Sequence, residues 1–231
     1  MKYSKLAMVG AVLAASMSFT GIARANTLSG AYYDQYLGPY TTLSLGSAPT
    51  TAPGVAPTAT FTVNSNSLGT IFNFKLPGTG VAGDWDLYNF VTYGGDSVTG
   101  INNVSGPGTD NINNGVLVFT GNVSLAAGAT YDVTHDDGAI LYLNNGSGWV
   151  TAINAPGATA AEDSSFTVGT GGTYSFELIY AEVNGGPAVL SSTNFDTTPE
   201  PSSLILLGTG LLGLAFALFR KNKASGLVLN S

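Results

Sequence analysis

Residues 131–143 of this chain read Tyr131-Asp132-Val133-Thr134-His135-Asp136-Asp137-Gly138-Ala139-Ile140-Leu141-Tyr142-Leu143. Before the Asp-Asp-Gly, apolar and polar side chains alternate as in a half-buried strand, and an apolar run follows it. Asp-Gly suits a tight turn because glycine accepts a positive φ and the aspartate can bond its own backbone. We therefore expect two strands joined by a turn at Asp136-Asp137-Gly138.

Similar short runs recur on both sides of this stretch, between Gly, Asn and Asp residues and without an intervening helical pattern. They predict strands at Ala59–Val63, Thr70–Leu76, Leu87–Tyr93, Val116–Leu125, Thr130–His135, Ala139–Leu143, Ser165–Val168, Thr173–Val183 and Ala188–Thr193. Many short strands indicate an all-β fold, an antiparallel sandwich or barrel, over residues 26–195. Residues 38–58 hold four prolines among Thr, Ala, Ser and Gly, which predicts a Pro/Thr-rich surface insertion.

The N-terminus has the order of a secretory signal peptide. Lys2 and Lys5 precede an apolar run, and Ala23 and Ala25 form a small-x-small cleavage site. We expect residues 1–25 to be removed and the exported chain to begin at Asn26.

The C-terminus has a three-part pattern of a short linker, an apolar segment and a basic end. Residues 196–201 form a linker that ends in the motif Pro199-Glu200-Pro201. Residues 202–219 are free of charge and close to the ~20 residues that span a bilayer, which predicts a transmembrane helix. The tail 220–231 then begins with a basic stop, and by the positive-inside rule it stays in the cytoplasm. The stop consists of Arg220, Lys221 and Lys223.

This tripartite tail resembles the PEP-CTERM sorting signal of Gram-negative bacteria. The resemblance implies export by the Sec machinery, a transient inner-membrane anchor, and cutting by an exosortase-type transpeptidase. The product would then reside at the cell surface or in the extracellular matrix. A permanently anchored type I membrane protein is the alternative if the tail is never cut.

Charge and cysteine content narrow the function further. Between Asn26 and Pro201 there are fourteen acidic side chains and one basic side chain, Lys75, which gives a formal charge of −13. Such a surface cannot neutralise phosphates, so nucleic-acid binding is excluded. It suits calcium-rich surroundings, or neutral or cationic sugars, although repulsion that keeps the protein soluble also accounts for it. The chain has no cysteine, and therefore no disulfide, thiol nucleophile or zinc-thiolate site.

The central stretch resembles the protective-antigen domain, a β-sandwich shared by bacterial toxins, glycosidases and yeast flocculins. The matching segments are Phe119-Thr120-Gly121, the Asp-Asp-Gly stretch, the opening run Leu28–Asp34, and the closing runs Gly172–Tyr180 and Asn184–Ala188. In flocculin-like members, adjacent aspartates of this loop bind Ca²⁺, which in turn holds sugar hydroxyls. The resemblance implies this role for Asp136 and Asp137, with Asn184 as a further ligand. The alternative is that Asp-Asp-Gly is only a turn.

Other candidate residues carry weaker signals. Trp85 and Trp149 could stack on a sugar ring or belong to the core. His135, the only histidine, lies beside Asp136 in the sequence, and Ser164 or Ser165 could join it, but no G-x-S-x-G elbow is present. A glycosidase carboxylate pair is defined by space rather than by sequence spacing, so a glycan-processing hydrolase stays open. We expect a non-catalytic exported protein associated with exopolysaccharide, in biofilm or floc formation.

Overall fold

The computed structural model describes residues 26–38, 47–65, 70–76, 86–102, 111–183, 187–195, 208 and 210–215. The chain divides into two units, and residues Ala25–Thr197 form the unit that contains the strands. The predicted signal peptide, its cleavage site and the Pro-Glu-Pro motif lie outside the described residues, as does the basic stop. Of the predicted transmembrane segment, residues 208 and 210–215 are described and are helical. Within the described part of the chain, no helix has the length and hydrophobicity that crossing a membrane requires.

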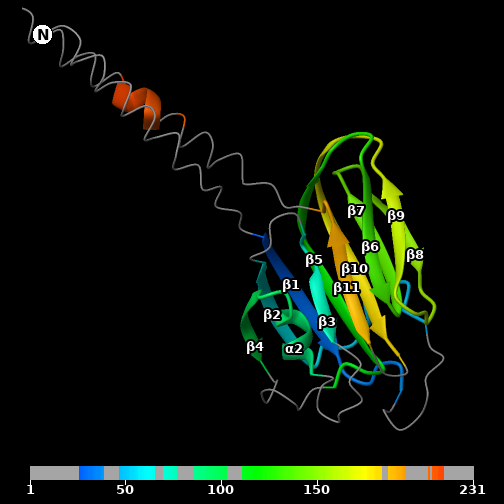
Figure 1. Cartoon of the computed structure of the whole chain (residues 1–231). Helices are drawn as coiled ribbons and strands as arrows, with labels where there is room; N and C mark the ends of the chain where they lie inside the picture. The colour runs from blue at the N-terminus through cyan, green and yellow to red at the C-terminus, as the bar shows by residue number, and fades with distance from the viewer. Residues whose placement is uncertain are drawn as a thin grey trace, which may run out of the picture. The chain divides into compact units, whose positions relative to one another are not determined.

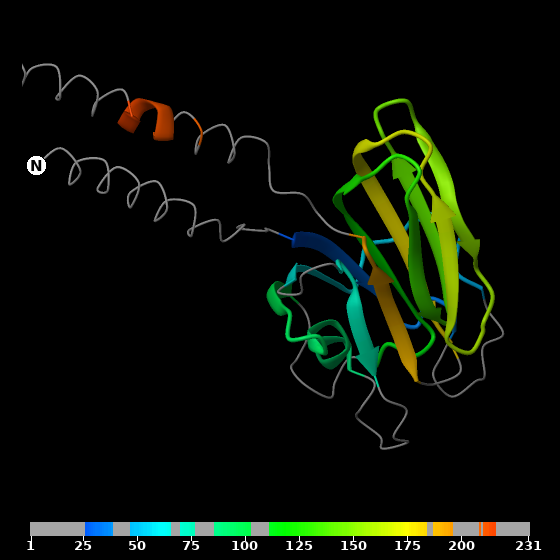
Figure 2. The same cartoon turned by 45° about the horizontal axis from the view of Figure 1, so that its top comes forward.

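Two antiparallel sheets face each other, as Figures 1 and 2 show. The larger sheet has the spatial order β4 (Ser97–Asn102), β2 (Ala59–Ser65), β1 (Asn26–Tyr33), β5 (Gly115–Leu125), β10 (Gly172–Glu182), β7 (Gly138–Asn144), β8 (Trp149–Ala155). The smaller sheet has the order β3 (Asn73–Leu76), β11 (Ala188–Thr193), β6 (Thr130–Asp136), β9 (Glu162–Thr167). The predicted antiparallel β-sandwich is thereby confirmed.

Aromatic side chains fill the space between the sheets. Phe72 is fully buried, and its ring lies 5.8 Å from the rings of Phe119 and Phe176 and 6.0 Å from that of Phe74. Phe195, just beyond β11, stacks on Phe72 with the centroids 6.1 Å apart. These edge-to-face and stacked pairs add to the burial of large apolar surfaces, so the core is rigid where the two sheets meet.

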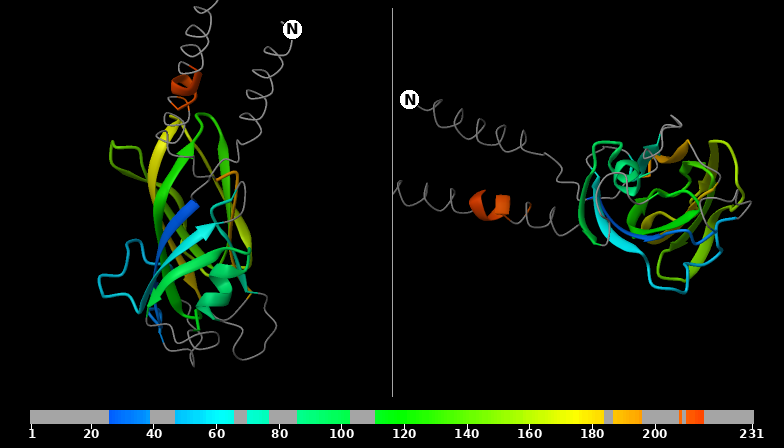
Figure 3. Two further views of the ribbon diagram at one scale, coloured as in Figure 1. Left: turned by 90° about the vertical axis from the view of Figure 1, so that its left-hand side faces the viewer. Right: turned by 90° about the horizontal axis from the view of Figure 1, so that it is seen from below.

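One predicted strand is wrong. Residues 87–93 were expected to be extended, but Leu87–Thr92 form the helix α2, visible beside β3 in Figure 3 and labelled in Figure 1. The Asp86 side chain accepts a 2.6 Å hydrogen bond from the backbone N–H of Tyr88 and thus caps the helix. Leu87, Phe90 and Val91 are buried at positions i, i+3 and i+4, a helical spacing hidden in a run of aromatic and β-branched residues.

Three strands were not expected from their local pattern: β1, β4 and β8. β4 and β8 lie at the two ends of the larger sheet. An edge strand is solvated on one side, so its side chains alternate less clearly than those of a central strand. β1 was foreseen only through its resemblance to the opening strand of the protective-antigen domain.

Residues 47–58 are the described part of the Pro/Thr-rich segment. They contain neither helix nor strand, and they lead into β2. They nevertheless pack on the outer face of the larger sheet. Ala48 is buried in a second apolar cluster with Val118 and Ile179, and its backbone N–H bonds the Pro156 carbonyl at 2.8 Å. The Tyr142 hydroxyl donates to the Thr50 carbonyl at 2.5 Å. This part of the segment therefore packs on the sheet through Ala48 and Thr50, while Gly54, Val55 and Ala56 are exposed.

Candidate functional site

The Asp-Asp-Gly sequence joins the two sheets. β6 ends at Asp136 and pairs with β11 of the smaller sheet, while β7 begins at Gly138 and pairs with β10 of the larger sheet. Asp137 alone makes the crossing, and the Asp136–Asp137 peptide is cis. The expected strands on both sides of Asp136-Asp137-Gly138 are present, with a bend at Asp137, but β6 and β7 belong to different sheets and do not pair as a hairpin.

The Asp137 carboxylate bonds distant segments instead of its own backbone. Its Oδ2 accepts the backbone N–H of Val183 at 2.7 Å, and its Oδ1 accepts that of Thr159 at 3.0 Å. The side chain thereby fastens the end of β10 and the loop after β8 to the crossing. An ionised carboxylate offers about four lone-pair sites, so two hydrogen bonds leave acceptor capacity for a cation.

Gly138 is required because another segment approaches it closely, and not because of a positive φ. It is not among the glycines with a positive φ. A Cβ at this position would lie 2.3 Å from the Pro156 carbonyl oxygen, a distance that a carbon atom cannot occupy. The loop after β8 therefore approaches the crossing so closely that only a residue without a side chain fits.

A third acidic side chain lies behind the two aspartates. Glu182, at the end of β10, is fully buried, whereas Asp136 and Asp137 keep 7% and 6% of their surface exposed. The Tyr180 hydroxyl donates to the Asp136 carbonyl oxygen and lies 2.8 Å from Glu182 Oε2. The other carboxylate oxygen, Oε1, has no hydrogen-bond partner among the described residues. A hydroxyl has one hydrogen, so both Tyr180 contacts are fully satisfied only when Glu182 carries a proton of its own.

The pKa values agree with this crowding of negative charge. Burial, and then repulsion from Asp137, raises the pKa of Asp136 to about 6, against the backbone N–H of Ala161, which lowers it. Burial also raises the pKa of Asp137, although the N–H groups of Val183 and Thr159 oppose the shift. Burial and the Asp137 charge raise the pKa of Glu182 well above its usual range. Desolvation and like charge both penalise ionised carboxylates, and a bound cation would reverse that penalty.

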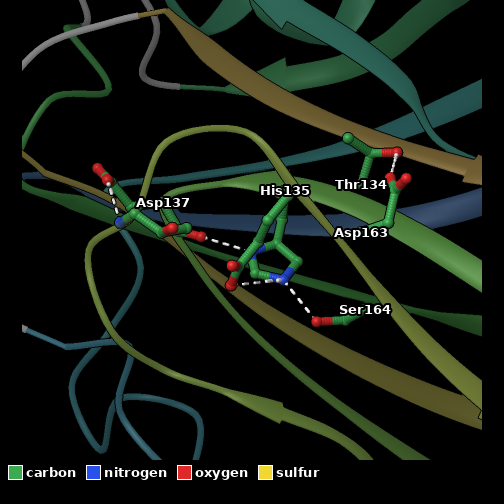
Figure 4. A network of polar contacts seen from close by, with 7 residues as sticks. Thr134, His135, Asp137, Asp163 and Ser164 are labelled. Carbon is green, nitrogen blue, oxygen red and sulfur yellow. Dashed lines mark hydrogen bonds and ion pairs between the residues drawn. The ribbon is translucent and has the colours of Figure 1, made fainter.

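His135 lies next to this cluster in a separate polar network, shown in Figure 4. The ring is fully buried, and Nδ1 lies 2.6 Å from the Asp137 carbonyl oxygen. Since a carbonyl only accepts, Nδ1 carries a hydrogen, while Nε2 lies 2.8 Å from the Ser164 hydroxyl and 3.9 Å from Glu162 Oε1. The ring therefore contacts the backbone of Asp137. It does not pair with the Asp136 carboxylate, although His135 lies beside Asp136 in the sequence.

The structure brings some of the expected site residues together and separates others. Asp136 and Asp137 are adjacent as expected, whereas Asn184 and Trp85 lie outside the described residues. Trp149 is 54% exposed and pairs with Asn144 at the far end of β7 from Gly138. Six residues of strand separate the two ends, about 20 Å, so Trp149 and the aspartates cannot contact one sugar ring. Among the described residues, no three His, Asp or Glu side chains are arranged to hold a metal ion by themselves.

The sequence reasoning missed Glu182 and Tyr180. A signal was present, because Tyr174, Phe176, Leu178 and Tyr180 alternate along the inward face of β10, and Glu182 takes the next inward position. A carboxylate at an inward strand position is unusual without a partner or an ion, and it marks the end of the strand where the Asp-Asp crossing lies.

The comparisons with known proteins address the tail and the fold. Residues 197–221 match the model of the PEP-CTERM protein-sorting motif, which confirms the predicted motif at the C-terminus. The match includes Pro199-Glu200-Pro201, Arg220 and Lys221, and Lys223 lies beyond it. No curated protein sequence matches the chain significantly.

Solved structures similar to this chain include small β domains. The chain is similar to the PA14 domain of the MpAFP antifreeze protein, with 18% identity over 78% of this chain and 95% of that one, at a TM-score of 0.46. It is also similar to a PA14 sugar-binding domain from an RTX adhesin, with 21% identity, 74% and 98% coverage, and a TM-score of 0.43. A β-glucosidase from Kluyveromyces marxianus in complex with glucose matches at 12% identity over 72% of this chain and 16% of that one, with a TM-score of 0.35.

Proposed function

We propose that this chain is a non-catalytic surface or matrix protein of a Gram-negative bacterium, with a sandwich of the protective-antigen type that binds glycans with the help of Ca²⁺. The sorting motif implies export and exosortase-dependent processing at the membrane. After processing, the protein associates with exopolysaccharide and contributes to biofilm or floc formation.

The observation that carries the binding proposal is that Asp136, Asp137 and Glu182 lie near enough for the Asp137 charge to raise the pKa of the other two, with Glu182 Oε1 buried and without a hydrogen-bond partner among the described residues. Ca²⁺ takes six to eight hard oxygen ligands, and the two aspartates supply carboxylates of this kind near the surface. Glu182 lies deeper, and burial raises its pKa well above its usual range, so it ionises only when a cation compensates its charge. Backbone carbonyls, water, the Asn184 amide and sugar hydroxyls would complete the coordination.

The surroundings of His135 support the non-catalytic part of the proposal. A general base must reach a substrate proton, but this imidazole is fully buried and both ring nitrogens are engaged. The His135–Ser164 contact therefore links the paired strands β6 and β9, and Ser164 is itself only part-buried. Hydrolase activity on a panel of polysaccharides is the finding that would favour the alternative of a glycan-processing enzyme.

The processing of both chain ends is tested by mass spectrometry of the exported protein. We expect the mature chain to begin at Asn26 and to lack peptides from Leu204 onward, because the motif marks the tail for removal. The precursor in a strain without the transpeptidase is the control. If the wild-type surface protein contains peptides up to Ser231, the tail is retained and the protein is a type I membrane protein.

Glycan binding is tested with the processed protein on an array that includes the producer's own exopolysaccharide. Binding is expected in millimolar Ca²⁺ and at least tenfold weaker in chelator, since the ion supplies the contact to the sugar hydroxyls. Asp137→Ala should lose binding in both conditions. Asp163→Ala is the matched control, because Asp163 is an exposed aspartate on the neighbouring strand that bonds Thr134 at 2.5 Å.

A further inference from the structure

β8 is the free edge of the larger sheet, at the right of Figure 1. No described segment pairs with its outer side. Its sequence, Trp149-Val150-Thr151-Ala152-Ile153-Asn154-Ala155, contains neither charge nor proline. Exposed backbone N–H and C=O groups on such an edge are a template for a further strand.

The other described edges each carry a feature that blocks strand addition. β9 exposes Glu162 and Asp163, and β3 has only four residues and exposes Lys75. β4 is irregular, since its pairing with β2 shifts register between Thr60 and Thr62 and Gly100 has a φ of +69°. Charges, short strands and bulges are the usual protections of an edge, and β8 lacks the first two.

β8 has one irregularity of its own, and it leaves half of the edge regular. The pairing with β7 shifts register between Leu141 and Tyr142. On one side of the shift, Trp149, Val150 and Thr151 pair in order with Asn144, Leu143 and Tyr142. Trp149 and Val150 are 54% and 60% exposed, so large apolar side chains stand at the regular half.

The distribution of charged side chains favours a second copy of this chain as the partner of β8. Residues 138–161 contain no ionisable Asp, Glu, Lys or Arg side chain, although the segment from Asn26 to Pro201 carries a formal charge of −13. Two copies of so acidic a domain repel each other over most of their surfaces. β8 and its partner β7 themselves carry no charge, although the neighbouring β9 exposes Glu162 and Asp163, so repulsion between two copies is weakest along the outer edge of β8. An edge paired with itself forms a closed two-fold interface.

We propose that β8 is a self-association edge, on which β8 of a second copy adds in antiparallel orientation and joins the two larger sheets. Backbone hydrogen bonds supply the attraction, and Trp149 and Val150 lose their exposed surface in the pair. One strand edge is a small interface, so the dimer is weak, with a Kd on the order of 10–100 μM. On a cell surface or in a matrix, where the protein is concentrated, such a contact would link neighbouring copies.

Sedimentation velocity on the processed protein from about 5 to 500 μM, at 0.05 and 0.5 M NaCl, tests the proposal. We expect a monomer–dimer equilibrium that is several-fold tighter at high salt, because salt screens the repulsion of the acidic domains. Val150→Lys should remain monomeric, since it places two positive charges together at the paired edge. Val55→Lys is the matched control, as Val55 is 61% exposed in the segment before β2, and it should dimerise like the wild type.

A cysteine on the strand provides a second readout that does not depend on affinity. The chain has no cysteine of its own, so Thr151→Cys introduces a single reporter. Mild oxidation should convert it to a disulfide-linked dimer, while Val55→Cys should remain monomeric. A wild-type protein that is monomeric at 500 μM in 0.5 M NaCl, or a dimer that Val150→Lys leaves intact, overturns the proposal.

Discussion

Replacing Gly138 by alanine is expected to lower the free energy of unfolding by about 3 kcal/mol, the upper end of the usual range for overpacked sites. The added Cβ would lie 2.3 Å from the Pro156 carbonyl oxygen, and the atom in the way belongs to the backbone. Neither the crossing from β6 to β7 nor the loop after β8 can move without breaking the bonds that Asp137 makes to Thr159 and Val183.

Thermal unfolding by circular dichroism measures this effect, and a decrease in Tm of roughly 10 °C is expected for a domain of this size. Gly157→Ala is the matched control, because Gly157 adjoins Pro156 in the same loop and a Cβ there meets no atom within 4 Å. Equal Tm values for the two variants would mean that the loop does not lie against Gly138 as described.

The second large effect is an inverted pH dependence of stability. In the calcium-free protein we expect Tm to fall as pH rises from 5 to 8, by on the order of 5 °C. A carboxyl group whose pKa is higher in the folded than in the unfolded state stabilises the fold below its unfolded pKa, and this contribution is lost as pH rises through the folded value. For Asp136 that window extends from 3.8 to about 6, and for Glu182 it reaches higher.

Glu182→Gln isolates the buried group. The amide cannot ionise, so the loss of stability between pH 5 and pH 8 should shrink by at least half. Glu177→Gln, the same change at an outward position of β10, should leave the wild-type profile unchanged. With saturating Ca²⁺ the wild-type profile should reverse, because an ion binds ionised carboxylates. A Tm that rises with pH without Ca²⁺, as in proteins stabilised by ion pairs, would contradict the account.

Strands were predictable from the sequence where buried and exposed side chains alternate along them. β5, β6, β7, β10 and β11 are central or nearly central strands, and their inward residues repeat at period two. β4 and β8 were not predictable because neither alternates cleanly: β8 exposes Trp149, Val150 and Thr151 in succession, and β4 contains Gly100 at a positive φ and pairs with a shifted register. The residues of α2 were predicted as a strand because aromatic and β-branched residues favour extended structure. The packing of Phe90 against Phe74 and Tyr180 stabilises the helix instead.

The site was predictable in part. The sequence marks Asp136 and Asp137, but it does not show that Gly138 is fixed by a carbonyl eighteen residues away or that Asp137 bonds Thr159 and Val183. Such constraints arise between segments that are distant in the chain. Glu182 was accessible in principle from its inward position on β10, and the alternation pattern would identify it in similar chains.

Asp136 and the C-terminal end of β11 lie at opposite ends of that strand. Val189, the second residue of β11, lies opposite Asp136, and the strand runs from there to Thr193 and on to Phe195. On strand geometry, the end of β11 at Thr193 therefore lies about 13 Å along the strand from Val189.

Whether the two aspartates bind glycan through Ca²⁺ is decided by comparing glycan binding by the processed protein in Ca²⁺, in chelator, and in Ca²⁺ with Asp137→Ala. We expect saturable binding in the first condition and a loss of at least tenfold in the other two. Binding that is unaffected by the chelator and by the substitution, or no binding to any glycan in Ca²⁺, would contradict the proposal.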